Sequence, residues 1–199
     1  LVPLGREEDA ARVVSRGVIV DFAGFREETS AVVEDLRRRD LTINALAIRL
    51  DPLLDETSEG LSHPATIIDP TNGLADLQRG VVRVVGAQCF ASDPLRLLRV
   101  FRFAATLGYA VDSTTMAMVQ QQCSLLTTVA PERIAYEMDL IMDAPGAHVV
   151  VAAMADCGLL WELIPELAAG RGMVQPESHH LDVWEHNLET LRKMEGLLG

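Results

Sequence analysis

Four charged side chains with a regular spacing could do chemistry in the middle of this 199-residue chain: Asp93, Arg96, Arg99 and Arg102. An arginine presents a planar fork of donors that is always charged, whereas an ionised aspartate only accepts hydrogen bonds. Side by side, the two can meet the edge of a nucleobase that carries both an acceptor and an exocyclic amine, as cytosine and adenine do. The arginines further along could clamp phosphates.

The same spacing is also typical of an exposed helix face whose charges form surface ion pairs. Ser92 or Asp93 can cap a helix that has Pro94 in its first turn, and Gly108 is suited to end it. At 100° per residue the three arginines lie on one arc, which should face away from the core. The opposite arc is apolar and consists of Leu97, Leu98, Phe101, Ala104 and Ala105. Spacing alone leaves both interpretations open.

A second basic group lies upstream, where three arginines at 37–39 precede Asp40. Three positive charges in one turn repel each other unless an anion lies nearby. A bound triphosphate could supply that anion, and so could Glu34 and Asp35 of the same segment. Both interpretations stay open here as well.

The first part of the chain predicts short strands and short helices. Residues 1–16 carry no strand or helix signal, and residues 51–66 predict a surface hairpin or loop whose acids are solvated. Asp21 interrupts a β-branched and aromatic strand, where it is either an outward-facing residue or a metal ligand. We expect the strands to form one small sheet: 18–26, 43–50, 66–69 and 81–86, with helices at 30–39 and 73–79.

After residue 86 the pattern changes to helices. Capping residues and apolar periodicity predict helices at 93–107, 112–123, from 131 onward and 147–157, followed by a body segment at 159–167 in which Trp161 is a core residue. The sequence therefore predicts an α+β fold, a small mixed sheet followed by an all-helical part. We place the domain boundaries at 1–86, 87–170 and 171–199.

Composition restricts the functional classes. The formal net charge of −12 argues against general affinity for nucleic acid, so any RNA contact requires a local basic patch. Three widely spaced cysteines among apolar neighbours predict reduced core residues of a cytoplasmic protein. No apolar run approaches the length of a membrane span, so we expect a soluble protein without membrane contact.

The C-terminal stretch 175–187 is rich in histidine. Asp182 and His186 are four residues apart on an expected helix, a spacing that can share one metal ion. A metal-dependent phosphohydrolase of the HD type would need further ligands downstream. The alternative is a capped helix start with partly buried histidines. The same two interpretations apply to His179 and His180.

Three segments in order resemble one known family. Residues 93–105 resemble the nucleotide-selecting helix of class II tRNA nucleotidyltransferases (CCA-adding enzymes) and bacterial poly(A) polymerases. Residues 34–47 resemble the Arg-Arg-Asp motif of that family, and residues 68–77 resemble the turn that follows it. The resemblance covers roughly residues 17–165.

The resemblance implies part of a nucleotidyltransferase palm, then a helical neck with a nucleotide- and RNA-binding function, then the start of an HD-like body. The implied reaction is attack of the tRNA 3′ hydroxyl on the α-phosphate of CTP or ATP, with loss of pyrophosphate. Whether C, A or both are added is left open. A poly(A) polymerase and a non-catalytic nucleotide- or RNA-binding module are the alternatives.

The resemblance also assigns residues. Asp93 and Arg96 would read the base, Arg39 and Arg99 would hold sugar or phosphate, and Arg102 would support them. Asp40 would orient Arg39, with Arg38 as a helper, and Asp21 would lie near the catalytic metals. Glu132, Arg133 and Glu137 resemble the family's next motif, which braces the preceding helices, and are expected to be structural. Ser92 stands where the family often has Glu.

The family's glycine-rich phosphate loop and its paired metal-binding aspartates are not found in residues 1–17. We expect them to precede Leu1, and we expect Mg²⁺ to be bound mainly by them. The 199-residue piece should then be inactive by itself.

Overall fold

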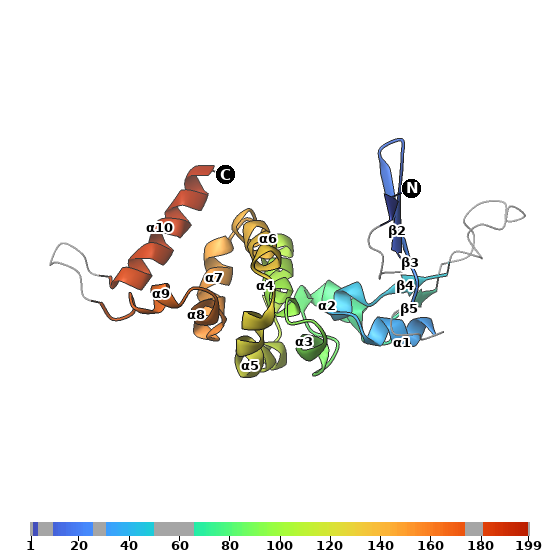
Figure 1. The fold of residues 1–199 in the computed structure, drawn as a ribbon, viewed down its shortest axis with the longest axis horizontal. Coiled ribbons are helices and arrows are strands. Elements are labelled where there is room, and N and C mark those ends of the chain that lie inside the picture. The colour runs from blue at the N-terminus through green and yellow to red at the C-terminus, as the bar shows by residue number, and fades with distance from the viewer. Residues whose placement is uncertain (1, 4–9, 26–30, 50–65, 174–180, 199) are drawn as a thin grey trace, which may run out of the picture.

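The computed structural model describes residues 2–3, 10–25, 31–49, 66–173 and 181–198. Figure 1 shows an elongated molecule, with the N-terminal strands at one end, a group of helices in the middle and the long C-terminal helix at the other end. Short strands are confined almost entirely to the first half, and helices dominate the second. The predicted α+β fold is confirmed.

The strands form three separate small sheets in the described part of the chain, so the prediction of one sheet is wrong. Pairs of two-residue strands are set by contacts distant in sequence, which local patterns do not reveal. The first sheet is antiparallel and contains β1 (Val2–Pro3), β2 (Ala10–Ser15) and β3 (Val18–Ala23). β4 (Ala47–Ile48) pairs antiparallel with β5 (Ile67–Ile68), and β6 (Val81–Val82) pairs parallel with β7 (Ala110–Val111).

Strand β2 lies where no strand was expected. It is joined to β3 by Arg16 and Gly17, both of which have positive φ angles (49° and 81°). Two such residues form the tight turn that matches the twist of a hairpin. The Arg-Gly pair between two β-branched runs was the available signal. The predicted loop at 51–66 lies outside the described residues, apart from Thr66.

The predicted helices are confirmed, with small shifts at their ends. Helix α4 begins at Arg96 instead of Asp93, because Asp93, Pro94 and Leu95 form a preceding turn in which the Arg96 amide donates to the Asp93 carbonyl at 3.0 Å. It ends at Leu107, and Gly108 has the expected left-handed conformation. The helices are α1 (Val32–Arg37), η2 (Thr42–Asn44), α2 (Gly73–Arg79), α3 (Cys89–Ser92), α4 (Arg96–Leu107), α5 (Ser113–Gln122), η4 (Cys123–Thr128), α6 (Pro131–Met142), α7 (Ala147–Asp156), α8 (Leu159–Leu163), α9 (Pro165–Ala168) and α10 (Val183–Leu198).

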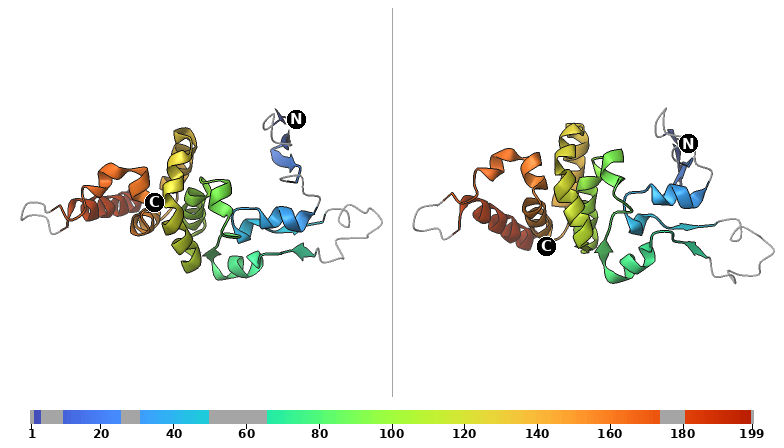
Figure 2. Two further views of the ribbon diagram at one scale, coloured as in Figure 1. Left: turned by 60° about the horizontal axis from the view of Figure 1, so that its bottom comes forward. Right: turned by 90° about the horizontal axis from the view of Figure 1, so that it is seen from below.

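Helix α4 is the centre of the hydrophobic core. Its predicted apolar arc is buried, and the helix packs against α6 and α7. Figures 1 and 2 both show α6 running beside α4. The expectation that the arginine arc faces away from the core is only partly right, because the Arg102 side chain is 18% exposed and lies against a buried acid of α6. Ion pairing allows these charges to sit at a helix interface.

The three cysteines and Trp161 lie in the helical part of the chain, after residue 86. Cys89 and Cys157 are buried free thiols and Cys123 is a half-buried one, as expected. Trp161 packs edge-on against Trp184 with ring centroids 5.0 Å apart, at the margin of the core. Within the described ranges, no helix is long and apolar enough to cross a membrane.

The start of α10 is a capped helix, and among the described residues Asp182 and His186 have no third acid, histidine or cysteine beside them that could complete a metal group. Asp182 accepts hydrogen bonds from the amides of Glu185 and Gly172, both at 2.7 Å. His186 is exposed, so the expectation of partly buried histidines is wrong for it, because its position on α10 faces solvent. His179 and His180 lie outside the described residues.

A buried carboxylate joins the two halves of the molecule. Asp76 of α2 accepts from the Thr42 hydroxyl at 2.8 Å and from Arg83 at 3.0 Å. Arg83 also contacts Asp112, the N-cap of α5, at 2.8 Å. Since Thr42 follows the basic segment 37–40 closely, this network fixes that segment relative to the helices.

Replacing Gly73 by alanine should lower the free energy of unfolding by about 2–3 kcal/mol. A Cβ atom at this position would lie 2.0 Å from the carbonyl oxygen of Thr42 and 2.7 Å from its carbon, and both are backbone atoms. Urea unfolding followed by circular dichroism measures the effect. Gly86→Ala is the matched control, because a Cβ there meets nothing within 4 Å. Equal stability of the two variants would contradict the prediction.

Candidate functional site

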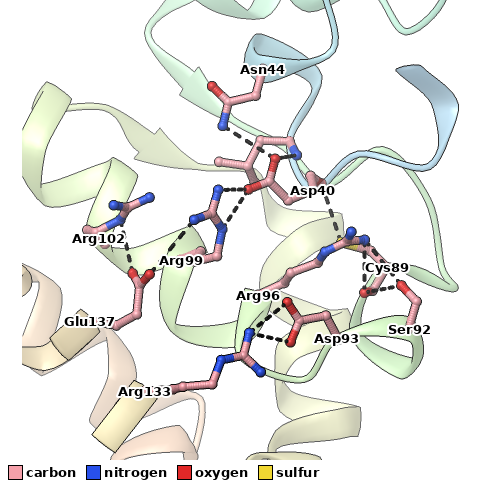
Figure 3. Close-up of polar contacts among 11 residues, drawn as sticks. Asp40, Asn44, Cys89, Ser92, Asp93, Arg96, Arg99, Arg102, Arg133 and Glu137 are labelled. Carbon is pink, nitrogen blue, oxygen red and sulfur yellow. Dashed lines mark hydrogen bonds and ion pairs between the residues drawn. The ribbon is translucent and has the colours of Figure 1, made fainter. Parts of the chain in front are cut away.

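A pocket of about 520 Å³ lies where the end of the α1 segment, η2, α4 and α6 come together. Five of the eight predicted site residues line it, although they come from segments more than fifty residues apart. Figure 3 shows four of these side chains, those of Asp40, Asp93, Arg96 and Arg99, with most of the groups that hold them. The lining residues are Arg39, Asp40, Asn44, Asp93, Leu95, Arg96, Arg99, Phe103 and Arg133.

Asp40 is the acceptor at the centre of the site. Its carboxylate accepts from Arg99 Nε at 2.8 Å and from Arg99 Nη2, and also from the Leu41 amide at 2.8 Å and Asn44 Nδ2 at 3.4 Å. Burial raises the pKa of Asp40, but the charge and hydrogen bonds of Arg99 outweigh burial and leave that pKa below its ordinary value. Asp40 is therefore an ionised anchor for Arg99.

This geometry corrects one expected contact. Asp40 orients Arg99 and not Arg39, because its carboxylate points toward α4. Arg39 is held by Asp35, one helical turn earlier, with Nη2 3.2 Å from Oδ2. Arg39 still lines the pocket.

Glu137 braces the arginines from α6. Its side chain is 4% exposed, and it lies 3.0 Å from Arg102 Nε and 3.8 Å from Arg99 Nη1. Burial raises the pKa of Glu137 despite the two positive charges beside it. The expected bracing contact between this segment and the preceding helix is confirmed.

Asp93 and Arg133 form the opposite wall of the pocket. Arg133 Nη2 donates to both carboxylate oxygens of Asp93 at 3.3 Å, and the Leu95 amide donates to Oδ1 at 3.3 Å. Arg133 was expected only as a bracing residue, yet its side chain is 53% exposed and lines the pocket.

Arg96 is held differently from the other lining arginines. Its Nη1 donates to Ser92 Oγ at 3.2 Å and to the Cys89 carbonyl at 3.4 Å, and Cys89 Sγ lies 3.9 Å away. The hydroxyl and the carbonyl carry no charge, and burial raises the pKa of the Cys89 thiol, which favours its neutral form.

One aromatic side chain lies among these charges. The guanidinium carbon of Arg102 is 4.4 Å from the ring centroid of Phe103, and that of Arg99 is 5.5 Å away. Cations above a ring are attracted to its face, so Phe103 helps to fix the two arginines. Sequence reasoning missed Phe103 and Asn44 as lining residues. The Asn44 position, four residues after Asp40, was the available signal.

The remaining predicted residues lie elsewhere. Arg38 is exposed, and neither it nor Arg102 is among the lining residues. Asp21 lies on β3, in a hairpin that Figures 1 and 2 place well away from α4. It pairs with Arg12 of β2 at 2.7 and 2.8 Å, and these hydrogen bonds lower the pKa of its carboxyl.

The described residues do not form a metal site: no three acids, histidines or cysteines among them lie together. Asp21 supplies one carboxylate, which Arg12 already occupies. The assignment of Asp21 as a metal ligand stays a prediction.

The pocket is a basic site on an acidic chain. Four arginines and two aspartates line it, while the chain as a whole carries a net charge of −12. Such a site can attract a polyphosphate, and the adjacent Asp93 and Arg96 offer an acceptor and donors to a base edge.

Two family models match the chain. The model described as "Poly A polymerase head domain" matches residues 7–83, and the one described as "Probable RNA and SrmB-binding site of polymerase A" matches residues 108–170. Together they cover well over half of the sequence.

Curated relatives and solved structures agree with these models. Over 97% of this chain, the sequence is 38% identical to the "Multifunctional CCA protein" of Pseudomonas aeruginosa. Over 96% of this chain, it is 34% identical to the "A-adding tRNA nucleotidyltransferase" of Deinococcus radiodurans. A solved "tRNA-processing enzyme with CTP" is 30% identical over 89% of this chain and 45% of its own, with a TM-score of 0.68. The chain spans about half the length of the curated relatives, 46% and 42% respectively.

Proposed function

The chain belongs to the family of class II tRNA nucleotidyltransferases and bacterial poly(A) polymerases, and from this membership we propose that the protein adds C, A or both to the 3′ end of tRNA. The nucleotides would come from CTP and ATP, and pyrophosphate would leave. The observation that carries the proposal is the pocket, which gathers the two predicted nucleotide-binding segments, 37–40 and 93–102, around one basic hollow.

The proposed roles follow from the contacts. Asp93 would accept the exocyclic amine of cytosine or adenine, and Arg96 would donate to the acceptor beside it. Guanine and uracil place a carbonyl where that amine would be, and a carboxylate repels it. Arg39 and Arg99 would bind sugar or phosphate. Asp40 would hold Arg99, and Arg102 would hold Glu137, which also lies beside Arg99.

Magnesium belongs to the proposal for the whole protein. In this enzyme class a divalent ion would activate the attacking hydroxyl and stabilise the negative charge on the phosphates, and Asp21 would be one of the residues that hold it. The described residues do not build a complete site for this ion. The proposed domain boundaries are 1–86, 87–170 and 171–199, and the matched ranges 7–83 and 108–170 fall within the first two domains.

Nucleotide binding by the chain tests the proposed pocket. CTP and ATP should bind more tightly than GTP and UTP, and Asp93→Ala or Arg96→Ala should weaken CTP and ATP about tenfold while leaving GTP and UTP unchanged. Titration calorimetry with the four triphosphates measures this. Arg192→Ala is the matched control, because it removes an exposed arginine of α10 that pairs with Glu189. Equal binding of all four nucleotides by every variant would contradict base reading by this pair.

The reaction itself is tested on the full-length protein. Labelled CTP and ATP should be transferred to tRNA that lacks its terminal nucleotides. Extension of an unrelated RNA by many A residues would instead identify a poly(A) polymerase, the activity after which both family models are named. Nucleotide binding without transfer would identify a non-catalytic binding module.

A further inference from the structure

Arg96 is the lining arginine that no carboxylate holds, as far as the described residues show. Arg39 pairs with Asp35, Arg99 with Asp40, and Arg133 with Asp93. The three contacts of Arg96 are to the Ser92 hydroxyl, the Cys89 carbonyl and the Cys89 sulfur. The excess positive charge of the pocket therefore resides at Arg96.

All three contacts use the same nitrogen of the guanidinium. Nη1 donates to Ser92 Oγ at 3.2 Å and to the Cys89 carbonyl at 3.4 Å. No described residue accepts from Nε or Nη2 of Arg96. A guanidinium held at one nitrogen keeps the donors of the other two for a ligand, in a fixed plane.

Ser92 is itself fixed in position. Its hydroxyl donates to the Cys89 carbonyl at 3.0 Å, within the short helix α3, and so its oxygen can accept from Arg96. Cys89 is buried, and its thiol lies 3.4 Å from the Asp40 carbonyl. The anchor of Arg96 is thus tied to the segment that holds Arg99. Figure 3 shows Ser92 and Cys89 side by side at the Arg96 guanidinium.

We propose that Ser92 is a positioning residue that sets nucleotide selection through Arg96. It aims the guanidinium by a neutral hydrogen bond, which leaves the full positive charge and the Nε and Nη2 donors for the nucleobase. This inference rests on the proposed function of the pocket. Because the anchor is a hydroxyl and not a carboxylate, it neutralises none of the charge of Arg96.

Ser92→Ala tests the proposal, with Ser92→Thr as the variant that keeps the hydroxyl. The first measurement is the heteronuclear NOE of the Arg96 Nε–H group by NMR, with the signal assigned by its loss in Arg96→Lys. We expect a rigid side chain in the wild type and in Ser92→Thr, and a clear drop of the NOE in Ser92→Ala. Ser124→Ala, which removes an exposed serine hydroxyl elsewhere, should change nothing.

The second measurement is calorimetric binding of CTP, ATP, GTP and UTP. Ser92→Ala should bind CTP and ATP about tenfold more weakly and leave GTP and UTP unchanged, and Ser92→Thr should bind within about twofold of the wild type. An unchanged NOE in Ser92→Ala overturns the proposal. If the wild type prefers CTP and ATP, the proposal is also overturned when Ser92→Ala binds these two nucleotides as tightly as the wild type. If the wild type shows no preference but the NOE drops, the positioning by Ser92 stands and the proposed function fails.

Discussion

Replacing Glu137 by alanine is expected to lower the free energy of unfolding by about 3–5 kcal/mol. Glu137 is 4% exposed and is the carboxylate beside Arg102, whose own side chain is 18% exposed. Removing one partner of a buried ion pair leaves the other charge without compensation, and that loss exceeds the value of the contact itself. Arg99 also loses a neighbouring charge at 3.8 Å, although Asp40 still holds it.

A matched double variant separates charge from packing. In Glu137→Met/Arg102→Met both charges are replaced by apolar side chains of similar length, and such replacements of buried pairs are often neutral or stabilising. We expect the double variant to recover most of the stability that Glu137→Ala loses. Urea unfolding, followed by the fluorescence of Trp161 and Trp184, measures all three proteins. A loss below about 1 kcal/mol in Glu137→Ala would show that the pair is a surface contact instead.

Local chemistry explains why most helices could be predicted. Pro131 in a first turn, Asp112 as an N-cap and Gly108 as a C-cap each act within one turn of their own position. The apolar arc of α4 has the same local character, because its period follows from helix geometry alone. The structure accordingly confirms these elements within a few residues.

Pairings between distant segments could not be predicted in the same way. The spacing of Arg99 places it on one arc of α4, but it does not say that its partner is Asp40, 59 residues earlier. Likewise β6 pairs with β7, which follows α4 in the chain, and not with the other predicted strands. Such contacts depend on how the elements pack, and several partners of suitable charge compete for each arginine.

The resemblance to a family found the lining of the pocket but not its internal connections. It selected eight residues, of which Arg39, Asp40, Asp93, Arg96 and Arg99 line the pocket, whereas Asp21, Arg38 and Arg102 do not. It assigned Asp40 to Arg39, whereas the structure pairs Asp40 with Arg99. A motif records which residue types recur, whereas the contacts of each side chain depend on how the distant segments pack together.

Asp40→Ala is expected to cost about 3–5 kcal/mol of unfolding free energy at pH 7, because it leaves Arg99 without its main partner and the Leu41 amide and Asn44 Nδ2 without an acceptor. The size of this loss should depend on pH. The pKa of Asp40 is lowered in the folded protein, so its ionised form favours folding. Its contribution is fully present above the unfolded pKa of about 3.9 and is lost as the pH falls through the lower folded value.

The difference in stability between wild type and Asp40→Ala should therefore stay constant from pH 7 to about pH 5 and shrink below about pH 4. Urea unfolding at pH 7, 5, 4 and 3 measures it. Asp21→Ala is the control: this carboxyl also has a lowered pKa and an arginine partner, but it lies on the exposed hairpin, where solvent screens the pair. We expect little change for Asp21→Ala at any pH. A deficit in Asp40→Ala that is as large at pH 3 as at pH 7 would mean that the site depends on the shape of the Asp40 side chain and not on its charge.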